Sequence, residues 1–534
     1  MTHHHTPAVA AGLLCLMLSA AAAQPAADCL VVYSKAVWTL PFNTAFLHVA
    51  PFDDASGGKR DSLLLSSFYN VIKSADGSRV ESFYERDLAA WIPDVARVGR
   101  NGFDAQRDLE VLSDRGGPPY RTVWPNETDH VPKGVVPFNA VVVPEGFLSA
   151  DKPGRLVLID VDSPERTEYL IADAGTRDPV CRDGRVENER WFYHQALFHD
   201  MDGDGLKDII TARASFKPFL FRCPPAGELV YFRNPGKALA PGTPWESRLL
   251  LGLPESLDGP EVNLDLADLD GDGTPEIIAT HFFNSDHITI FGAPAGQPWS
   301  AIDPAAGRPM RRQTVMTGQG RPFAVEAIDL NLDGRLDILT SNHQGDGCFD
   351  VTRDAIPGRV IALEQPANGR IFDEPWRTHV LKDNIRPHPT VPTPVRGPGR
   401  LAPNRAAAFW PQRSMEGREQ PWIVVGGDEA SKVWVLKPRA GRAWDYESFV
   451  IFDINVHYGP NTTQTLLDDP QGVKIGTIGG LTWRYDRPGP NGRAEIYAPV
   501  FEARQIHVFS FRRGSGKPVI CTADTTIACP APAS

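Results

Sequence analysis

Three segments in the middle third of the chain repeat one another. They begin at Ala196, Val262 and Phe323, and each holds an apolar stretch, the pattern Asp-x-(Asp/Asn)-x-Asp-Gly-x-x-(Asp/Glu), and a second apolar stretch. The first Asp of the pattern falls at positions 200, 268 and 329, so the repeat period is 68 residues and then 61. That length suits a four-stranded antiparallel blade, and for a chain of 534 residues it predicts a radial β-repeat rather than one ordinary core.

The Asp-rich loops have the donor spacing of calcium sites. Ca²⁺ binds six to eight oxygens, and carboxylates at alternate positions of a curled loop converge on one point. The Gly at the sixth position allows the positive φ that closes the loop. An EF-hand is not expected, because Thr211, Ala279 and Thr340 stand where its last Glu would be. The predicted Ca²⁺ ligands are Asp200, Asp202, Asp204 and Asp208 in the first loop, Asp268, Asp270, Asp272 and Glu276 in the second, and Asp329, Asn331, Asp333 and Asp337 in the third.

With these motifs the chain resembles the FG-GAP or VCBS repeat family, which occurs in integrin α-chain propellers, secreted proteins and polysaccharide-active enzymes. The resemblance covers the three central repeats. It implies an all-β fold, a β-propeller that is usually seven-bladed, with Ca²⁺ held between the first two strands of a blade.

Four weaker segments complete the predicted ring. They begin at His48, Phe138, Ala406 and Ile478 and keep the strand–turn–strand rhythm without the full ligand set, so we expect no tight metal site there. We therefore predict a seven-bladed propeller over residues 29–513, with six or eight blades left open. The segments 100–132 and 386–405 are rich in Gly, Pro and charge and are interpreted as loops.

The two ends of the chain indicate a secreted protein. Residues 1–23 resemble a signal peptide, apolar from Pro7 and ending in three alanines. The remaining cysteines form an even set, which favours disulfides whose connectivity stays open, and residues 514–534 form a tail in which Cys521 and Cys529 are the most local pair. Cys15 lies in the predicted signal peptide, and the six that remain are Cys29, Cys181, Cys223, Cys348, Cys521 and Cys529.

Net charge and hydropathy argue against some classes of partner, and two sequons predict glycosylation. The formal charge is −12 without a basic stripe, which argues against nucleic acid, and no later stretch predicts membrane insertion. Asn126 and Asn461 begin glycosylation sequons.

A binding face is expected opposite the Asp-rich loops. Loops from several blades would bring His194, His281, Asn284, His343 and Asp428 to one solvent-facing mouth. Two functions fit such a mouth, and the sequence leaves open whether the protein is an enzyme. One is a binding or adhesion module for carbohydrate or an extracellular protein. The other is a carbohydrate-active lyase or dehydratase that works around His194, His281 and His343.

Overall fold

The computed structural model describes most of the chain between Leu30 and Ala528. The described residues are 30–53, 58–68, 72–73, 79–80, 87–114, 122–147, 154–174, 180–182, 185–187, 191–215, 226–251, 259–282, 285–303, 306–343, 356–387, 402–459, 463–466, 469–474, 476–513 and 525–528. The predicted signal peptide, Asn284 and Asn461 lie outside these ranges, and no cysteine side chain lies among those described.

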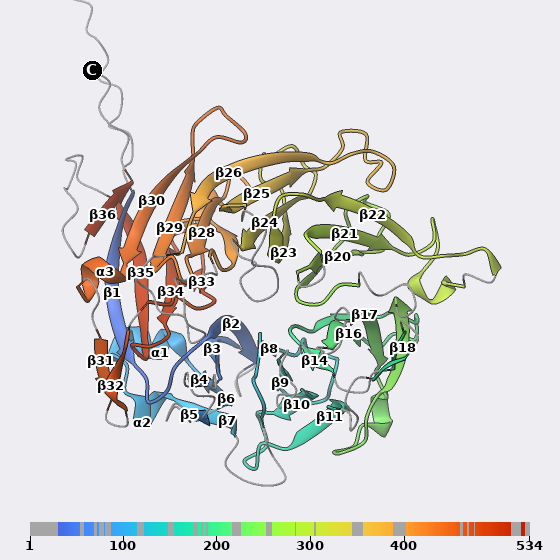
Figure 1. Ribbon diagram of the computed structural model, residues 1–534, viewed down its shortest axis with the longest axis horizontal. Helices are drawn as coiled ribbons and strands as arrows, with labels where there is room; N and C mark the ends of the chain where they lie inside the picture. Colours follow the sequence, from blue (N-terminus) through green and yellow to red (C-terminus); the bar gives the residue numbers. More distant parts are fainter. Residues whose placement is uncertain are drawn as a thin grey trace, which may run out of the picture.

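Seven antiparallel sheets follow one another around a central axis (Figure 1), so the predicted seven-bladed β-propeller is confirmed. Blade 1 holds β2 (Phe46–Asp53), β3 (Lys59–Ser67), β6 (Leu88–Ile92) and β7 (Glu110–Asp114). Blade 2 holds β8 (Asp129–His130), β9 (Ala140–Pro144), β10 (Leu156–Asp160) and β11 (Glu168–Ala172). Blade 3 holds β14 (Phe192–Tyr193), β15 (Leu197–His199), β16 (Asp208–Ser215), β17 (Ala226–Arg233) and β18 (Glu246–Leu251).

The other four blades keep this plan. Blade 4 holds β19 (Leu264–Ala267), β20 (Glu276–His281), β21 (His287–Gly292) and β22 (Arg311–Met316), and blade 5 holds β23 (Arg321–Ile328), β24 (Asp337–His343), β25 (Gly358–Glu364) and β26 (Arg377–Ile385). Blade 6 holds β27 (Ala406–Phe409), β28 (Trp422–Gly426), β29 (Lys432–Pro438) and β30 (Tyr446–Asp453), and blade 7 holds β33 (Thr482–Tyr485), β34 (Ala494–Val500) and β35 (Gln505–Arg513).

Blade 7 is completed by both ends of the described chain. Strand β1 (Leu30–Thr39) pairs with β35 from Leu30↔Arg513 to Thr39↔Gln505, and β36 (Thr525–Ala528) adds to its other edge. The N-terminal strand therefore closes the ring by hydrogen bonds to the last blade. The sequence placed these residues in the propeller or in the tail without predicting this closure.

Short elements decorate the ring. They are the helices α1 (Val95–Asn101), α2 (Ala105–Asp108) and α3 (Ile454–His457), and the paired strands β4 (Ile72–Lys73) with β5 (Arg79–Val80), β12 (Val180–Arg182) with β13 (Arg185–Glu187), and β31 (Thr463–Leu466) with β32 (Asp469–Lys474). Within the described ranges, no helix has the length and apolar character needed to cross a bilayer.

The second blade corrects the sequence analysis. The segment 100–132 is not a loop throughout, because it contains β7 and the inner strand β8. The segment that begins at Phe138 supplies the second and third strands, β9 and β10, not the first two. Strand β8 has no alternating apolar pattern, because its two residues are polar and contact blade 1: Asp129 pairs with His48 at 2.9 Å and the His130 ring meets Phe52.

Apolar packing between neighbouring sheets holds the blades together. Leu64 and Trp91 of blade 1 belong to the same buried cluster as Val141, Val157 and Ile159 of blade 2. Both faces of the middle strands are thus covered, which explains their continuous apolar runs. The inner strand of each blade begins on one face of the ring, which is here called the mouth face. It ends on the opposite face, where the Asp-rich loops lie.

Candidate functional site

The three Asp-rich loops join the first and second strands of blades 3, 4 and 5, as predicted. In each loop the first Asp accepts a hydrogen bond from the sixth-position glycine N–H, at 2.9 Å for Gly205, 3.0 Å for Gly273 and 2.8 Å for Gly334. These glycines have φ of 86°, 88° and 85°, the left-handed backbone that the motif requires. At the fourth position Gly203 and Gly271 also have positive φ, and Leu332 follows them with φ 61°. The three loops therefore share one turn.

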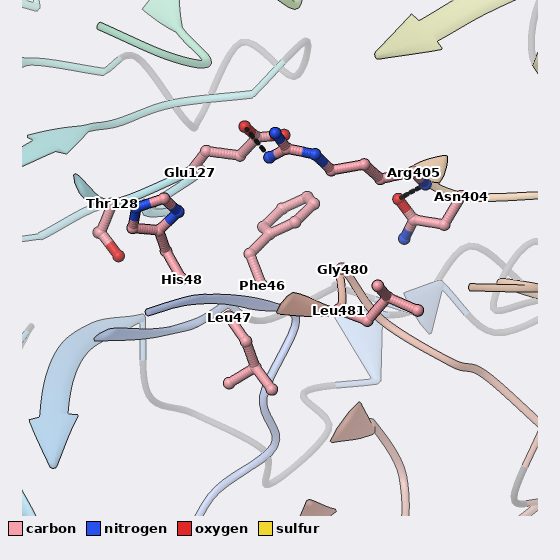
Figure 2. A pocket seen from close by; sticks show the side chains of 9 residues that line it. All are labelled: Phe46, Leu47, His48, Glu127, Thr128, Asn404, Arg405, Gly480 and Leu481. Carbon is pink, nitrogen blue, oxygen red and sulfur yellow. Dashed lines mark hydrogen bonds and ion pairs between the residues drawn. The ribbon is translucent and has the colours of Figure 1, made fainter. Parts of the chain in front are cut away.

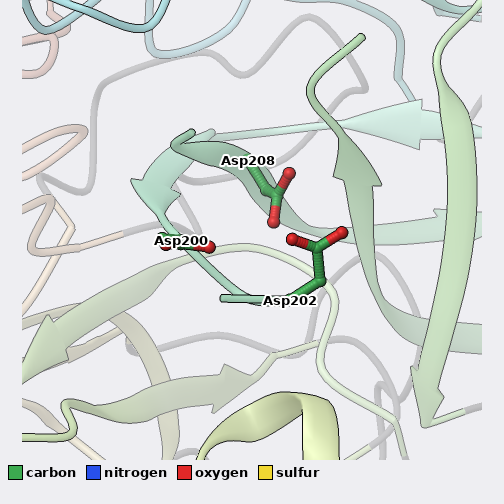
Figure 3. A group of neighbouring side chains, drawn as sticks. All are labelled: Asp200, Asp202 and Asp208. Carbon is green, nitrogen blue, oxygen red and sulfur yellow. The ribbon is translucent and has the colours of Figure 1, made fainter. Parts of the chain in front are cut away.

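Carboxylates converge inside these turns. Ligand oxygens of Asp200, Asp202 and Asp208 all lie within 4.8 Å of one another (Figure 3), and those of Asp268, Asp270 and Glu276 do the same. The ninth-position acids are buried, and each accepts the second-position backbone N–H, for example Met201 to Asp208 at 2.9 Å. Asp204 and Asp272 lie outside the two convergent groups.

The third loop repeats the turn with an amide in place of one acid. Asp329 accepts from the N–H of Asp333 and of Gly334, and Asn331 donates to Asp333 at 3.0 Å. The ninth-position Asp337 accepts from Leu330 N–H at 3.1 Å. An all-oxygen donor set of this kind fits a hard cation such as Ca²⁺.

Arginines also reach the loops. Arg233 lies 2.5 Å from Asp202 and 3.2 Å from Asp204, and Arg311 lies 3.4 Å from Asp270 and 3.5 Å from Glu276. Burial raises the pKa of Glu276 to about 7, although the Leu269 N–H opposes this. A positive charge near these closely packed carboxylates therefore stabilises their ionised forms.

The predicted histidines lie on the mouth face but do not face solvent. His194, His281 and His343 are only 8%, 2% and 4% exposed, so that part of the prediction is wrong. His343 stacks on Phe323 with ring centroids 4.6 Å apart, and burial lowers its pKa to about 3. The His281 ring lies 3.9 Å from His287. His281 and His343 end β20 and β24, whereas His194 follows β14, and all three rings pack against other aromatic or imidazole rings.

Two other predicted residues are also placed. Asp428 is half-buried after β28 with φ 49°, and burial, together with Glu429 and Glu502, raises its pKa. Asn126 is 2% exposed, and its side-chain nitrogen donates to the carbonyls of Gly146 at 2.8 Å and Tyr193 at 2.7 Å. A glycan on Asn126 does not fit this structure, because that nitrogen is buried and both of its hydrogens are used.

Aromatic side chains line the mouth face. Trp124 lies between Phe68 and Phe147, with centroids 4.1 and 4.4 Å away, and Phe46 lies 5.9 Å from Phe68. These four rings are here called the aromatic arc. Phe147 is 39% exposed at its outer end. Trp124 has φ 49°, an uncommon backbone for an aromatic residue that tertiary packing holds in place. The arc joins blades 1 and 2 at the mouth.

One residue from each blade forms a ring at the mouth end of the channel, here called the entry ring. It consists of Phe46, Glu127, His194, Asn263, Phe323, Arg405 and Gly480, each in or next to the start of its inner strand. Arg405 of blade 6 reaches Glu127 of blade 2 at 3.5 Å, across the channel (Figure 2). His194 meets Phe46 and Phe323 edge-on, at 5.5 and 5.7 Å. The ring therefore has polar and aromatic members from non-adjacent blades.

A second polar layer lies beneath it. His48 and Asp129 form an ion pair at 2.9 Å. Burial disfavours the charged form of both groups, but the opposite charge and hydrogen bond of the partner outweigh burial. The pKa of His48 is therefore raised and that of Asp129 is lowered. Asp265 and Glu326 accept the backbone N–H of the next blade, at 2.7 Å from Ala327 and 2.9 Å from Ala408. Burial raises the pKa of Asp265, and that of Glu326 to about 7, while Arg405 opposes both shifts.

Sequence reasoning missed the channel residues. Glu127 was hidden in the sequon of Asn126, and Arg405 ended a segment interpreted as a Pro-rich loop. One signal was available, because Asp265 and Glu326 stand three positions before the first loop Asp of consecutive repeats. An acid repeated inside an apolar inner strand indicates a channel-facing position.

Comparisons with known proteins assign the chain to no family. No family model and no curated protein matches the chain. It is similar to two solved auxiliary nutrient binding proteins, from Bacteroides thetaiotaomicron (9% identity, 91% of this chain, 77% of that chain, TM-score 0.36) and Bacteroides ovatus (9%, 91%, 98%, 0.36). It is also similar to an α-L-arabinanase from Cellvibrio cellulosa (10%, 61%, 96%, 0.30). Scores this low carry no argument about function, and the FG-GAP or VCBS resemblance stays a prediction.

Proposed function

We propose that this protein is a secreted, calcium-braced propeller that binds carbohydrate at its mouth face. The observation that carries the proposal is the aromatic arc, which borders a ring of hydrogen-bonding side chains. Aromatic rings present flat apolar surface to the C–H faces of a sugar, while a few placed polar groups bind its hydroxyls. Both kinds of group occur here on one face.

The exposed end of the arc supplies the apolar contact. Phe147 stacks on Trp124, which is backed by Phe68, so the outer ring has a rigid support. A supported ring loses little conformational entropy when a ligand covers it. The polar partners of the entry ring, Glu127 and Arg405, lie nearer the axis.

Calcium in this proposal is a brace and does not touch the ligand. The three loops occupy the face opposite the mouth and share one turn and one type of oxygen donor. A cation that neutralises their buried acids would stabilise the link between the first and second strands of three consecutive blades. Secretion, predicted from residues 1–23, would expose the loops to extracellular calcium, and extracellular calcium modules bind with Kd values of about 10⁻⁴–10⁻³ M.

The alternative function, a lyase or dehydratase, depended on three histidines. His194, His281 and His343 are buried, and His343 stays neutral well below neutral pH. No observation on the described residues favours catalysis at these positions, so the binding module is the function that we propose.

Two single-ring variants test the proposal. Wild-type protein is screened on an array of neutral and acidic glycans, and the affinity of any hit is measured by calorimetry. We expect Phe147→Ala to weaken binding about ten-fold, since it removes apolar contact of the order of 1.4 kcal/mol. The matched control is Phe103→Ala, which removes a ring that is stacked on Trp38 at 5.4 Å and is not part of the aromatic arc. Equal losses in both variants would remove the mouth as the binding face, and the absence of any glycan hit would refute the proposed function.

A further inference from the structure

The entry ring holds a carboxylate that its donors approach only loosely. The Glu127 oxygens lie 3.3 and 3.5 Å from Asn263 Nδ2, 3.5 Å from the Arg405 guanidinium and 3.9 Å from His194 Nδ1. A charge-assisted hydrogen bond is normally about 2.7–2.9 Å long. All three contacts are therefore longer than a strong bond, and the 3.9 Å approach of His194 exceeds the distance of about 3.5 Å beyond which a bridging group is expected.

His194 gives independent support for a ligand at this point. His194 is 8% exposed. Its Nδ1 lies 3.9 Å from a Glu127 oxygen and has no hydrogen-bond partner. Burial lowers the His194 pKa, with Glu127 opposing, so the imidazole tends to be neutral. A buried polar atom without a partner costs free energy, which a bound hydroxyl would recover.

A small pocket opens beside two of these groups, Glu127 and Arg405. Phe46, His48, Glu127, Arg405 and Gly480 are among its lining residues, and Figure 2 shows the Phe46 ring between His48 and Arg405. The pocket lies on the channel axis side of the arc, where residues from four blades meet. It can take a group of about the size of one or two waters, not a whole sugar ring.

The charges at this end of the channel select a neutral group. Arg405 offsets Glu127 and His48 offsets Asp129, and the nearby Asp265 and Glu326 add no positive charge. A carboxylate or phosphate entering the ring would meet these acids, and Arg405, the arginine that contacts Glu127 among the described residues, is already paired with it. A hydroxyl fits, because it can donate to Glu127 and accept from Arg405 or Asn263.

We infer that the entry ring is a subsite for one terminal hydroxyl or hydroxymethyl group, so that the protein binds a neutral saccharide end-on. The inference rests on the proposed carbohydrate binding and adds the ligand class and its orientation. The apolar faces of the terminal sugar residue lie against the aromatic arc, which includes Phe46. The terminal group lies in the small pocket against Glu127 and Arg405, next to the carboxylate that Asn263 and His194 also approach.

End-capped oligosaccharides test the orientation. The probes are the linear cello-, malto-, xylo-, manno- and arabino-hexaoses, each free, reduced to the alditol at one end, or O-methylated at the other. Wild-type affinity is measured by calorimetry. We expect at least one hexaose to bind, and one of its two caps to weaken binding roughly 10- to 100-fold, the range of one lost hydrogen bond to a charged group. Its other cap should have little effect.

Isosteric variants test the residues. Glu127→Gln should weaken binding of the free hexaose by a similar 10- to 100-fold. The matched control is Glu364→Gln, which should leave binding unchanged. Glu364 lies far from the mouth, at the end of β25, and its carboxylate pairs with His379 at 2.7 Å. His194→Gln gives a second variant with the same expectation if Glu127→Gln lowers the melting temperature. Folding of every variant is checked by thermal unfolding.

The outcomes separate the two proposals. If both caps and the folded ring variants leave affinity unchanged while Phe147→Ala still weakens it, the end-on inference is wrong and the mouth proposal stands. If the wild type binds none of the hexaoses, neutral end-on binding is overturned, and the glycan array decides whether the mouth binds another carbohydrate.

Discussion

Replacing Asp270 by Asn tests how much bound calcium at the second loop adds to the free energy of unfolding, because the substitution keeps the hydrogen bond of the turn. Asp270 Oδ1 accepts the Asp272 N–H at 3.2 Å, and Oδ2 lies 3.4 Å from Arg311. Asn keeps the first acceptor and removes the negative charge. A single site at one hundred times Kd stabilises the folded state by about 2.7 kcal/mol, so we expect the variant to lose roughly 2 kcal/mol in excess calcium.

Without calcium the same change should cost little. The lost contact with Arg311 is a partly exposed ion pair, worth about 0–1 kcal/mol. Relief of repulsion from the neighbouring carboxylates of Asp268 and Glu276 acts in the opposite direction. The difference between the two conditions is therefore the signature of calcium.

The assay is chemical unfolding in about 10 mM CaCl₂ and in excess chelator, with bound calcium counted by mass spectrometry. The control is Asp53→Asn, which removes a surface pair with Lys133 at 3.3 Å and should behave alike in both conditions. The calcium proposal is refuted if chelator leaves wild-type stability unchanged. It is also refuted at this loop if Asp270→Asn keeps the full calcium effect.

Three further substitutions have distinct expected signs. His48→Gln should destabilise the protein more at about pH 5.5 than at about pH 8.5, which unfolding midpoints measured across pH would show. The His48 pKa is raised in the folded state, so the stabilisation by Asp129 is complete below the unfolded-state pKa and is lost as pH rises through the folded-state pKa. Glu326→Gln should gain stability relative to wild type as pH rises from about 5 to 8, because a Glu with a pKa of about 7 loses stability over that range while Gln keeps the acceptor; an unchanged difference between the two proteins would contradict this. Asn126→Leu should cost about 2 kcal/mol or more, because it leaves two buried carbonyls without donors, and intact mass of native protein should show no glycan at Asn126.

The repeated loops made the fold predictable from the sequence. Asp200, Asp268 and Asp329 mark the same turn in three blades, and once that period is set, the weaker segments fall into register. Gly205 and its equivalents have the positive φ that the motif predicted. The prediction worked because the turn depends on local residue types.

The mouth could not be predicted in the same way. Whether His343 faces solvent depends on Phe323, which comes from a neighbouring strand of the same sheet, and on Phe282 of another blade. The contact between Glu127 and Arg405 joins residues 278 positions apart whose own segments carry no strand pattern. Packing across the ring decides both, and a single sequence does not show which residues meet there.

Amide hydrogen exchange with and without the tightest-binding hexaose tests the central claim most directly. Peptides that cover 122–130, 260–264 and 402–408 should gain protection, because they carry the mouth end of three inner strands. Peptides that cover 200–208, 268–276 and 329–337 should stay unchanged in saturating calcium. Protection confined to the Asp-rich loops, with none at the mouth, would contradict the account.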